Sequence, residues 1–282
     1  MAGVTSQDDR SHEMGMHTEQ LGGRTQQVFF SPEDEENFLY PFAFDVDFNK
    51  RAEFDAVDME PNAINLRIRE LVASGHGTIV VKNPGAKHSI GVGILNRLNL
   101  IFEGSLGYFG VGLIDGPNVR IQGRVGWSCA ENMMAGTVVI EKNAGSTFGA
   151  AIRGGDLVCR GSVGSRTGID QKGGTIVVGG DTGAFSGFMM QRGRMVVCGN
   201  AGKHLGDSMY DGTIYVGGEI ADLGVDAVPG ELTDIDRLWL TRKLKQYDLL
   251  SENGVDHFQK IVAGKKLWSY DNLEPTEKKM VL

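Results

Sequence analysis

Short apolar stretches recur along the middle of the chain, and each is bounded by glycine. Examples are Thr137–Ile140, Asp156–Cys159, Thr175–Val178 and Arg194–Val197, which are rich in β-branched residues. Runs this short are typical of β-strands, because a helix of a globular protein needs roughly ten or more residues. The pattern therefore predicts a series of short strands separated by turns.

Glycine marks a fixed period in the same region. Of the 41 glycines, 35 lie between Gly75 and Gly230. A constant step of nineteen positions relates the members of three series: Gly136, Gly155, Gly174, Gly193, Gly212; Gly126, Gly145, Gly164, Gly183, Gly202; and Gly149, Gly168, Gly187, Gly206. A fixed period in this range indicates a solenoid. The register extends back through residues 117–121, 98–102 and 77–81, which predicts eight successive strands.

So short a unit has no room for a strand, a crossover helix and two loops. The predicted fold is therefore all-β: a single right-handed parallel β-helix with short flanking helices and extended terminal arms, its coils stacked about 4.8 Å apart. Equivalent positions should form two internal apolar ladders. These are Val138, Leu157, Ile176, Met195, Ile214 and, beside them, Ile140, Cys159, Val178, Val197, Val216.

Two helices are expected beside the repeat. Pro61 opens a stretch that ends near Gly75 and carries Ile64, Ile68, Leu71 and Val72 on one face. Thr233–Asp236 resembles a capping box ahead of a helix that continues through Tyr247, with Ile235, Leu238 and Trp239 on one face. Because the ends of a solenoid expose unpaired strand edges, we expect both helices to cap it.

This pattern divides the chain into four parts. Residues 1–55 form an N-terminal arm that is expected to be partly mobile, 56–75 a capping helix, 76–230 the β-helix, and 231–282 a C-terminal helix and tail. The arm holds seven of the 13 phenylalanines around the acidic run Glu33–Glu36. It cannot build a core of its own, so it either lies on the solenoid or docks into a partner, and both alternatives stay open.

Composition narrows the possible functions. The formal net charge of −8 argues against a general binder of nucleic acid or of anionic membranes, which needs excess positive charge. The N-terminus has no secretory signal pattern and no stretch is long and apolar enough to span a membrane, so a cytoplasmic location is expected. Cys129, Cys159 and Cys198 are widely spaced, which favours buried free thiols over disulfides or a zinc site.

Candidate chemistry in the repeat is weak. The glycine clusters Gly104–Gly110 and Gly199–Lys203 do not open a helix in a βαβ unit, so the repeat explains them better than a nucleotide loop does. The six histidines are scattered without the spacing of metal ligands. Asp156, Asp170, Asp181, Asp207 and Asp211 stand at different phases of their coils, which argues against a carbohydrate-cleaving row of carboxylates. We therefore predict no catalytic, cofactor-binding or metal-binding residues in this chain.

Three segments carry a family resemblance: His88–Gly93, Phe102–Gly110 and Arg166–Gly174. They resemble the GXGXG domain at the C-terminal end of the glutamate synthase large subunit, over roughly residues 64–228. In the fused enzyme of that family, amidotransferase and flavin-binding synthase domains precede this module. We expect this chain to be a freestanding form of the module, without those two domains.

Gly123–Ser128 and Phe188–Arg194 make the freestanding form most similar to the β-helix subunit family of N-methylglutamate synthase, also called methylamine–glutamate N-methyltransferase. That resemblance implies a non-catalytic subunit of a hetero-oligomer. Its partners would be an amidotransferase-like subunit and a glutamate-synthase-like subunit that holds FMN and an iron–sulfur cluster. The alternative is the C subunit of a formylmethanofuran dehydrogenase or of a formyltransferase/hydrolase complex.

Overall fold

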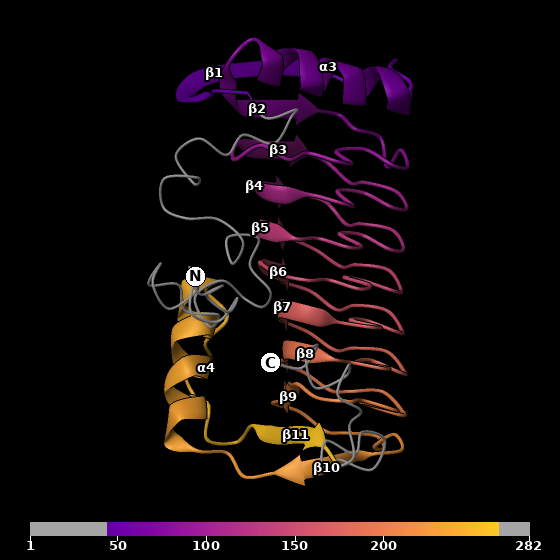
Figure 1. Cartoon of the computed structure of the whole chain (residues 1–282), viewed down its shortest axis with the longest axis vertical. Helices are drawn as coiled ribbons and strands as arrows, with labels where there is room; N and C mark the ends of the chain where they lie inside the picture. Colours follow the sequence, from indigo (N-terminus) through magenta and orange to yellow (C-terminus); the bar gives the residue numbers. More distant parts are fainter. Residues whose placement is uncertain (1–43, 265–282) are drawn as a thin grey trace, which may run out of the picture.

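Residues 44–264, which the computed structural model describes, form a column of stacked coils (Figure 1). One eleven-stranded sheet runs along this part of the chain, and the equivalent strands of successive coils pair in parallel. The strands of the column are β2 (His76–Lys82), β3 (Asn99–Glu103), β4 (Asp115–Ile121), β5 (Ala135–Ile140), β6 (Asp156–Cys159), β7 (Lys172–Val178), β8 (Arg192–Val197) and β9 (Thr213–Val216). The predicted all-β parallel β-helix is confirmed.

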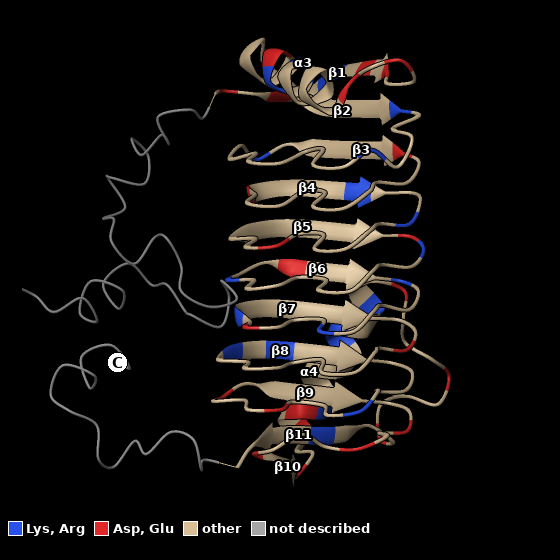
Figure 2. Cartoon of the chain, turned by 90° about the vertical axis from the view of Figure 1, so that its right-hand side faces the viewer, with Lys and Arg blue, Asp and Glu red and all other residues tan. Residues whose placement is uncertain are grey.

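The register of the sheet follows the sequence period. Val138 of β5 pairs with Leu157 of β6, which pairs with Ile176 of β7. Figure 2 shows the strands as parallel rungs, with many of the charged residues in the turns between them. One period of the sequence is therefore one step up the column.

Apolar side chains fill the interior of the column. None of the residues in the two predicted ladders, from Val138 to Ile214 and from Ile140 to Val216, is accessible to solvent. Both ladders are therefore confirmed. Full burial of one aliphatic side chain stabilises the folded state by roughly 1.5–3 kcal/mol.

The ladder gives a direct test. Val178→Asp should lower the free energy of unfolding by several kcal/mol, because it places a carboxylate among buried apolar side chains. Asn118→Asp, on the exposed outward side of β4, is the control; it loses only a 3.3 Å surface hydrogen bond to Asn99 and should change it by less than about 1 kcal/mol. Denaturant titration measures both. A normal unfolding curve for Val178→Asp would contradict the inward position of this side chain.

Each coil turns at a corner distant from the strands, at the right of Figure 1. In one coil the Ala150 N–H donates to the Thr147 carbonyl (3.1 Å) and the Ile152 N–H donates to the Gly149 carbonyl (3.2 Å), which makes two overlapping β-turns. The φ angles of Thr147, Gly149 and Ala151 are 56°, 66° and 54°. Positive φ at the third position is what a type II turn requires.

The central glycine of the corner also lies against the core. A Cβ on Gly168 would clash with Met195 Cε and would lie 3.0 Å from Ile176 Cδ1. Earlier coils carry Val111 and Ala130 at the same place with positive φ, so the turn itself tolerates a side chain. The glycines from Gly149 onward lie against core side chains, which would have to shift to make room for a Cβ.

Two alanine substitutions separate backbone strain from packing. Gly254 has a φ of 65°, close to the 63° of Gly168, but nothing lies within 4 Å of the Cβ it would gain. Gly254→Ala should therefore cost about 1 kcal/mol from the left-handed conformation alone. Gly168→Ala should cost about 1–3 kcal/mol more from overpacking. Equal losses of unfolding free energy for the two variants would contradict the packing argument.

Helix α3 (Pro61–Ala73) lies at the N-terminal end of the column. Pro61 occupies the first turn, and Ile64, Ile68, Leu71 and Val72 are buried against the core as predicted. Strand β1 (Asp47–Asp55) pairs in parallel with β2 and extends the sheet, which the sequence pattern does not predict. This part of the arm lies on the column, whereas its residues 1–43 lie outside the described range.

The C-terminal end is built differently from the expectation. Strand β11 (Gln259–Ala263) pairs antiparallel with β9, and β10 (Ala227–Gly230) pairs antiparallel with β11. Helix α4 (Asp234–Gln246) does not cap this end. It lies along the side of the column and packs on the outward faces of β6–β9 (Figure 1).

The inward face of α4 also differs from the expectation. Ile235 and Leu238 are 80% and 59% exposed, whereas Asp236, Leu240 and Leu244 are buried. The capping box of Thr233 and Asp236 is present as predicted. Hydrogen bonds from Tyr215 and Lys260 hold the Asp236 carboxylate against the column. These contacts determine which face of the helix is turned towards the column.

No helix in residues 44–264 has the length and the apolar character that crossing a membrane requires.

Candidate functional site

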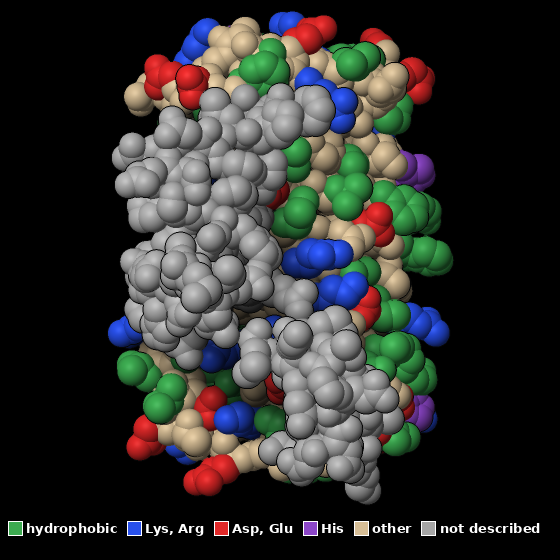
Figure 3. All heavy atoms as spheres, in the orientation of Figure 1, with side chains coloured by type: hydrophobic (Ala, Val, Ile, Leu, Met, Phe, Trp, Pro, Cys, Tyr) green, Lys and Arg blue, Asp and Glu red, His purple; other side chains and the backbone are tan. Residues whose placement is uncertain are grey.

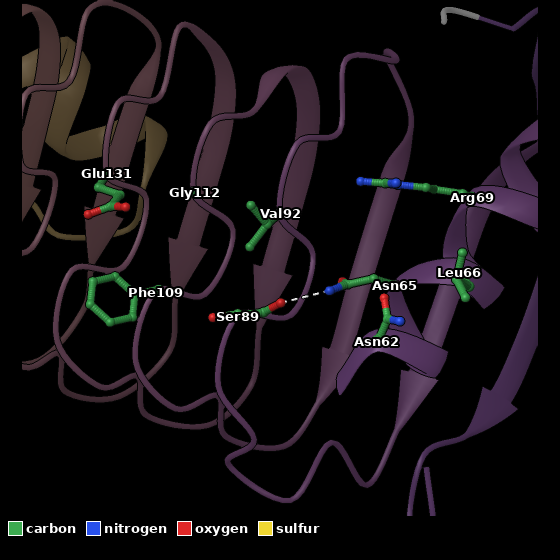
Figure 4. Close-up of a pocket in the computed structure, with 9 residues that line it drawn as sticks. All are labelled: Asn62, Asn65, Leu66, Arg69, Ser89, Val92, Phe109, Gly112 and Glu131. Atoms are coloured by element: carbon green, nitrogen blue, oxygen red, sulfur yellow. Dashed lines mark hydrogen bonds between the residues drawn. The ribbon is translucent and has the colours of Figure 1, made fainter. Parts of the chain in front are cut away.

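An open groove lies between α3 and the corners of the first coils (Figure 4). Its volume is about 430 Å³. Helix α3 supplies one wall, and the corners of three successive coils supply the other. The lining residues are Asn62, Asn65, Leu66, Arg69, Ser89, Val92, Phe109, Gly112 and Glu131.

Asn65 fixes the helix to the first corner. Its Nδ2 donates to the Ser89 carbonyl (2.7 Å), and its Oδ1 accepts from the Gly91 N–H (2.8 Å). Ser89, Gly91 and Gly93 all have positive φ, so this corner has the same alternating left-handed backbone as the corner at Thr147, Gly149 and Ala151. The pair of hydrogen bonds makes the groove wall a fixed part of the fold.

Opposite charges stand at the two ends of the groove. Figure 4 shows the Arg69 side chain extending from α3 towards Val92, with Glu131 at the far end beside Phe109. Neither the Arg69 nor the Glu131 side chain forms an ion pair or a hydrogen bond with a described residue. Within residues 44–264, the groove therefore has one cation and one carboxylate that no opposite charge neutralises.

An aromatic stack runs beside the groove on the same corners. The rings of His88 and Tyr108 are 4.6 Å apart, and those of Tyr108 and Trp127 are 5.3 Å apart. Tyr108 and Trp127 are 42% and 57% exposed. The rings lie over glycines of the next coil, since a Cβ on Gly126 would lie 2.5 Å from Tyr108 Cδ1. Figure 3 shows apolar side chains gathered along this edge of the molecule.

A cluster of Asp236, Tyr215 and Lys260 lies under α4. Burial opposes ionisation of Asp236, but hydrogen bonds from Lys260 (2.8 Å) and Tyr215 (2.6 Å), together with Thr233, hold its pKa below the ordinary value. Burial and the nearby Asp236 carboxylate raise the pKa of Tyr215. These groups form hydrogen bonds with one another. The cluster therefore ties the helix to the sheet and presents no free acid or base.

The cluster predicts a pH dependence. Asp236→Asn should lower the unfolding free energy at neutral pH by about 2–4 kcal/mol, because Lys260 loses its buried counter-charge. Folding lowers the pKa of Asp236, so its contribution is present above the unfolded value of about 3.9 and is lost as the pH falls towards the lower folded pKa.

The difference between the wild type and Asp236→Asn should therefore stay constant from neutral pH down to about pH 5 and shrink below about pH 4. Denaturant titrations across this range measure it. A difference that is unchanged at about pH 3 would contradict the assignment.

Two of the three thiols are buried as expected, whereas Cys198 is only half-buried. Cys129 and Cys159 are buried inside the column, and Cys198 packs on the side of α4. Burial raises the pKa of Cys198 to about 11 and that of Cys159 to about 12. No group of three or more His, Cys, Asp or Glu in residues 44–264 is arranged to hold a metal ion.

The aspartates of the repeat that were considered as candidate catalytic carboxylates have different partners in the structure. Asp156 accepts from Lys243 and Tyr247 under α4, and Asp181 accepts from the Asn200 N–H of the next coil. Asp170 pairs with Lys172. The structure does not bring these carboxylates together.

The groove at α3 could not be predicted from the sequence, because its walls come from residues that are far apart in the chain and are brought together only by the stacking of the coils.

These features define the class: a parallel β-solenoid whose corners carry alternating left-handed residues. Residues 59–281 match the model of the family described as GXGXG motif, well over half of the chain. The chain belongs to the GXGXG family, whose domain is typical of glutamate-synthase-like proteins. Comparison with curated proteins found no match.

Proposed function

We propose that the chain is a non-catalytic structural subunit of a glutamate-synthase-like complex that makes N-methylglutamate from glutamate and methylamine, with release of ammonia. The observation that carries the proposal is the GXGXG match over residues 59–281. The partners would be an amidotransferase-like subunit and an FMN-binding subunit with an iron–sulfur cluster. We expect the complex to be cytoplasmic.

The hydrogen bonding and packing of the column support this role. Continuous backbone ladders join neighbouring coils, and the interior is filled with interlocked side chains. Such a body resists deformation, and transfer of a small amine between two sites depends on holding both in fixed positions. The column supplies a frame on which partner subunits are held at a constant separation. The reacting groups would be theirs.

Co-purification tests the proposal. A tagged full-length chain, isolated from its native source, should bring down an amidotransferase-like and an FMN-binding subunit, and the complex should form N-methylglutamate. The isolated chain should neither bind FMN nor turn over glutamate and methylamine. Activity of the isolated chain would contradict the proposal. Formyltransferase-type partners would instead support a formyl-transferring complex.

A further inference from the structure

The groove at α3 has an arrangement that complements itself. Its cation, Arg69, lies at the helix end and its carboxylate, Glu131, at the other end. An exposed apolar side chain stands near each charge: Leu66 (51% exposed) lies on α3, and Phe109 (45% exposed) lies beside Glu131. A two-fold axis through the middle of the groove would set each charge against its opposite and each apolar side chain against another.

The separation of Arg69 and Glu131 along the column allows two ion pairs between the copies at once. Nη2 of Arg69 lies 3.8 Å from the place a Cβ on Gly93 would take. The Gly93 N–H donates to Gly112, and the Leu113 N–H donates to Glu131, so Glu131 lies two coils further along. Two coil steps are about 10 Å. The charges are therefore too far apart to neutralise each other within one molecule, yet are spaced to pair across two.

The repeat itself shows that these apolar side chains are not needed for the coil. The position of Phe109 is taken by Ser128 and Thr147 in the next two coils, and that of Trp127 by Ser146 and Ser165. The corner geometry persists throughout, since Phe109, Ser128 and Thr147 have φ of 57°, 55° and 56°. Large exposed apolar residues on the coils next to α3 therefore call for another explanation. Aromatic residues and arginine are enriched at protein interfaces.

We propose that this groove is a homodimer interface in which two copies of the chain meet about a two-fold axis. Arg69 of one copy pairs with Glu131 of the other, twice, and Leu66 packs against Phe109 of the other copy. Val92 lies near the axis. Tyr108 and Trp127 extend the apolar contact along the corners. The arrangement is isologous, the commonest type of symmetric contact. It leaves the side of the column that carries α4 free for other subunits.

Charge exchange tests the proposal on the purified full-length chain. Sedimentation velocity should give a species of about twice 30.5 kDa for the wild type. Arg69→Glu and Glu131→Arg should each be monomeric, because each sets like charges opposite one another in both pairs. An equimolar mixture of the two variants should dimerise again, since the mixed pair restores two opposite-charge contacts.

Matched controls separate the contact from general effects. Arg67→Glu makes the same charge change on the same helix, but Arg67 pairs with Glu70 and does not line the groove. It should stay dimeric. Phe109→Ser should weaken dimerisation at least tenfold, whereas Met189→Ser, on a distant corner, should not. Unchanged melting temperatures would show that the variants are folded.

Three results would overturn the proposal: a monomeric wild type at about 100 µM, dimers of either charge variant alone, or a mixture that stays monomeric. Phe109→Ser keeps the proposal falsifiable if Glu131→Arg fails to fold, since a folded but still dimeric Phe109→Ser would also overturn it. None of these outcomes depends on the partners expected under the proposed function, so the two proposals can fail separately.

Discussion

The structure depends on hydrogen bonds between equivalent backbone positions of successive coils. At the corners, the N–H of Gly149 donates to the preceding coil, at Cys129, while those of Thr147 and Ala151 donate to the following coil, at Ser165 and Ile169. Alternating left-handed residues turn the N–H groups in these opposite directions. The backbone therefore satisfies its donors without a helix or a flat strand, in a loop region that would otherwise need water or side chains. The same rule repeated in each coil sets the period of the sequence.

Much of the architecture could be predicted from the sequence because the repeat is local. The period gave the coil length, and the apolar residues at equivalent positions of successive coils gave the inward ladders. The position of α4 was missed, although the strands contained a signal for it. Ile176–Val178 and Met195–Val197 are apolar at every position, which is typical of strands covered on both faces, whereas Asn118–Ile121 alternates. The helix was instead assigned to the open end, where its exposed Ile235 and Leu238 were expected to pack.

Strand β1 and the groove depend on contacts that no local pattern contains. The sequence of β1 is highly charged and has few strand-forming residues, so its conformation is decided by pairing with β2. The groove depends on which residues the stacking brings within reach of α3. By contrast, the polar groups that sequence reasoning set aside, among them Asp156 and Asp181, serve to join a helix or a neighbouring coil to the column.

The last strand of the sheet has a consequence for the assembled protein. Strand β10 is the outermost strand at the C-terminal end, and its third residue is Pro229, which has no N–H to offer. Its short length and this missing donor leave an incoming strand little to pair with. At the opposite end, the outermost strand β1 is crowded with lysine, arginine, aspartate and glutamate. A protein made of stacked parallel β-coils resembles a short fibril in its backbone, and a proline at one end and a dense row of charges at the other both disfavour end-to-end pairing of its described strands.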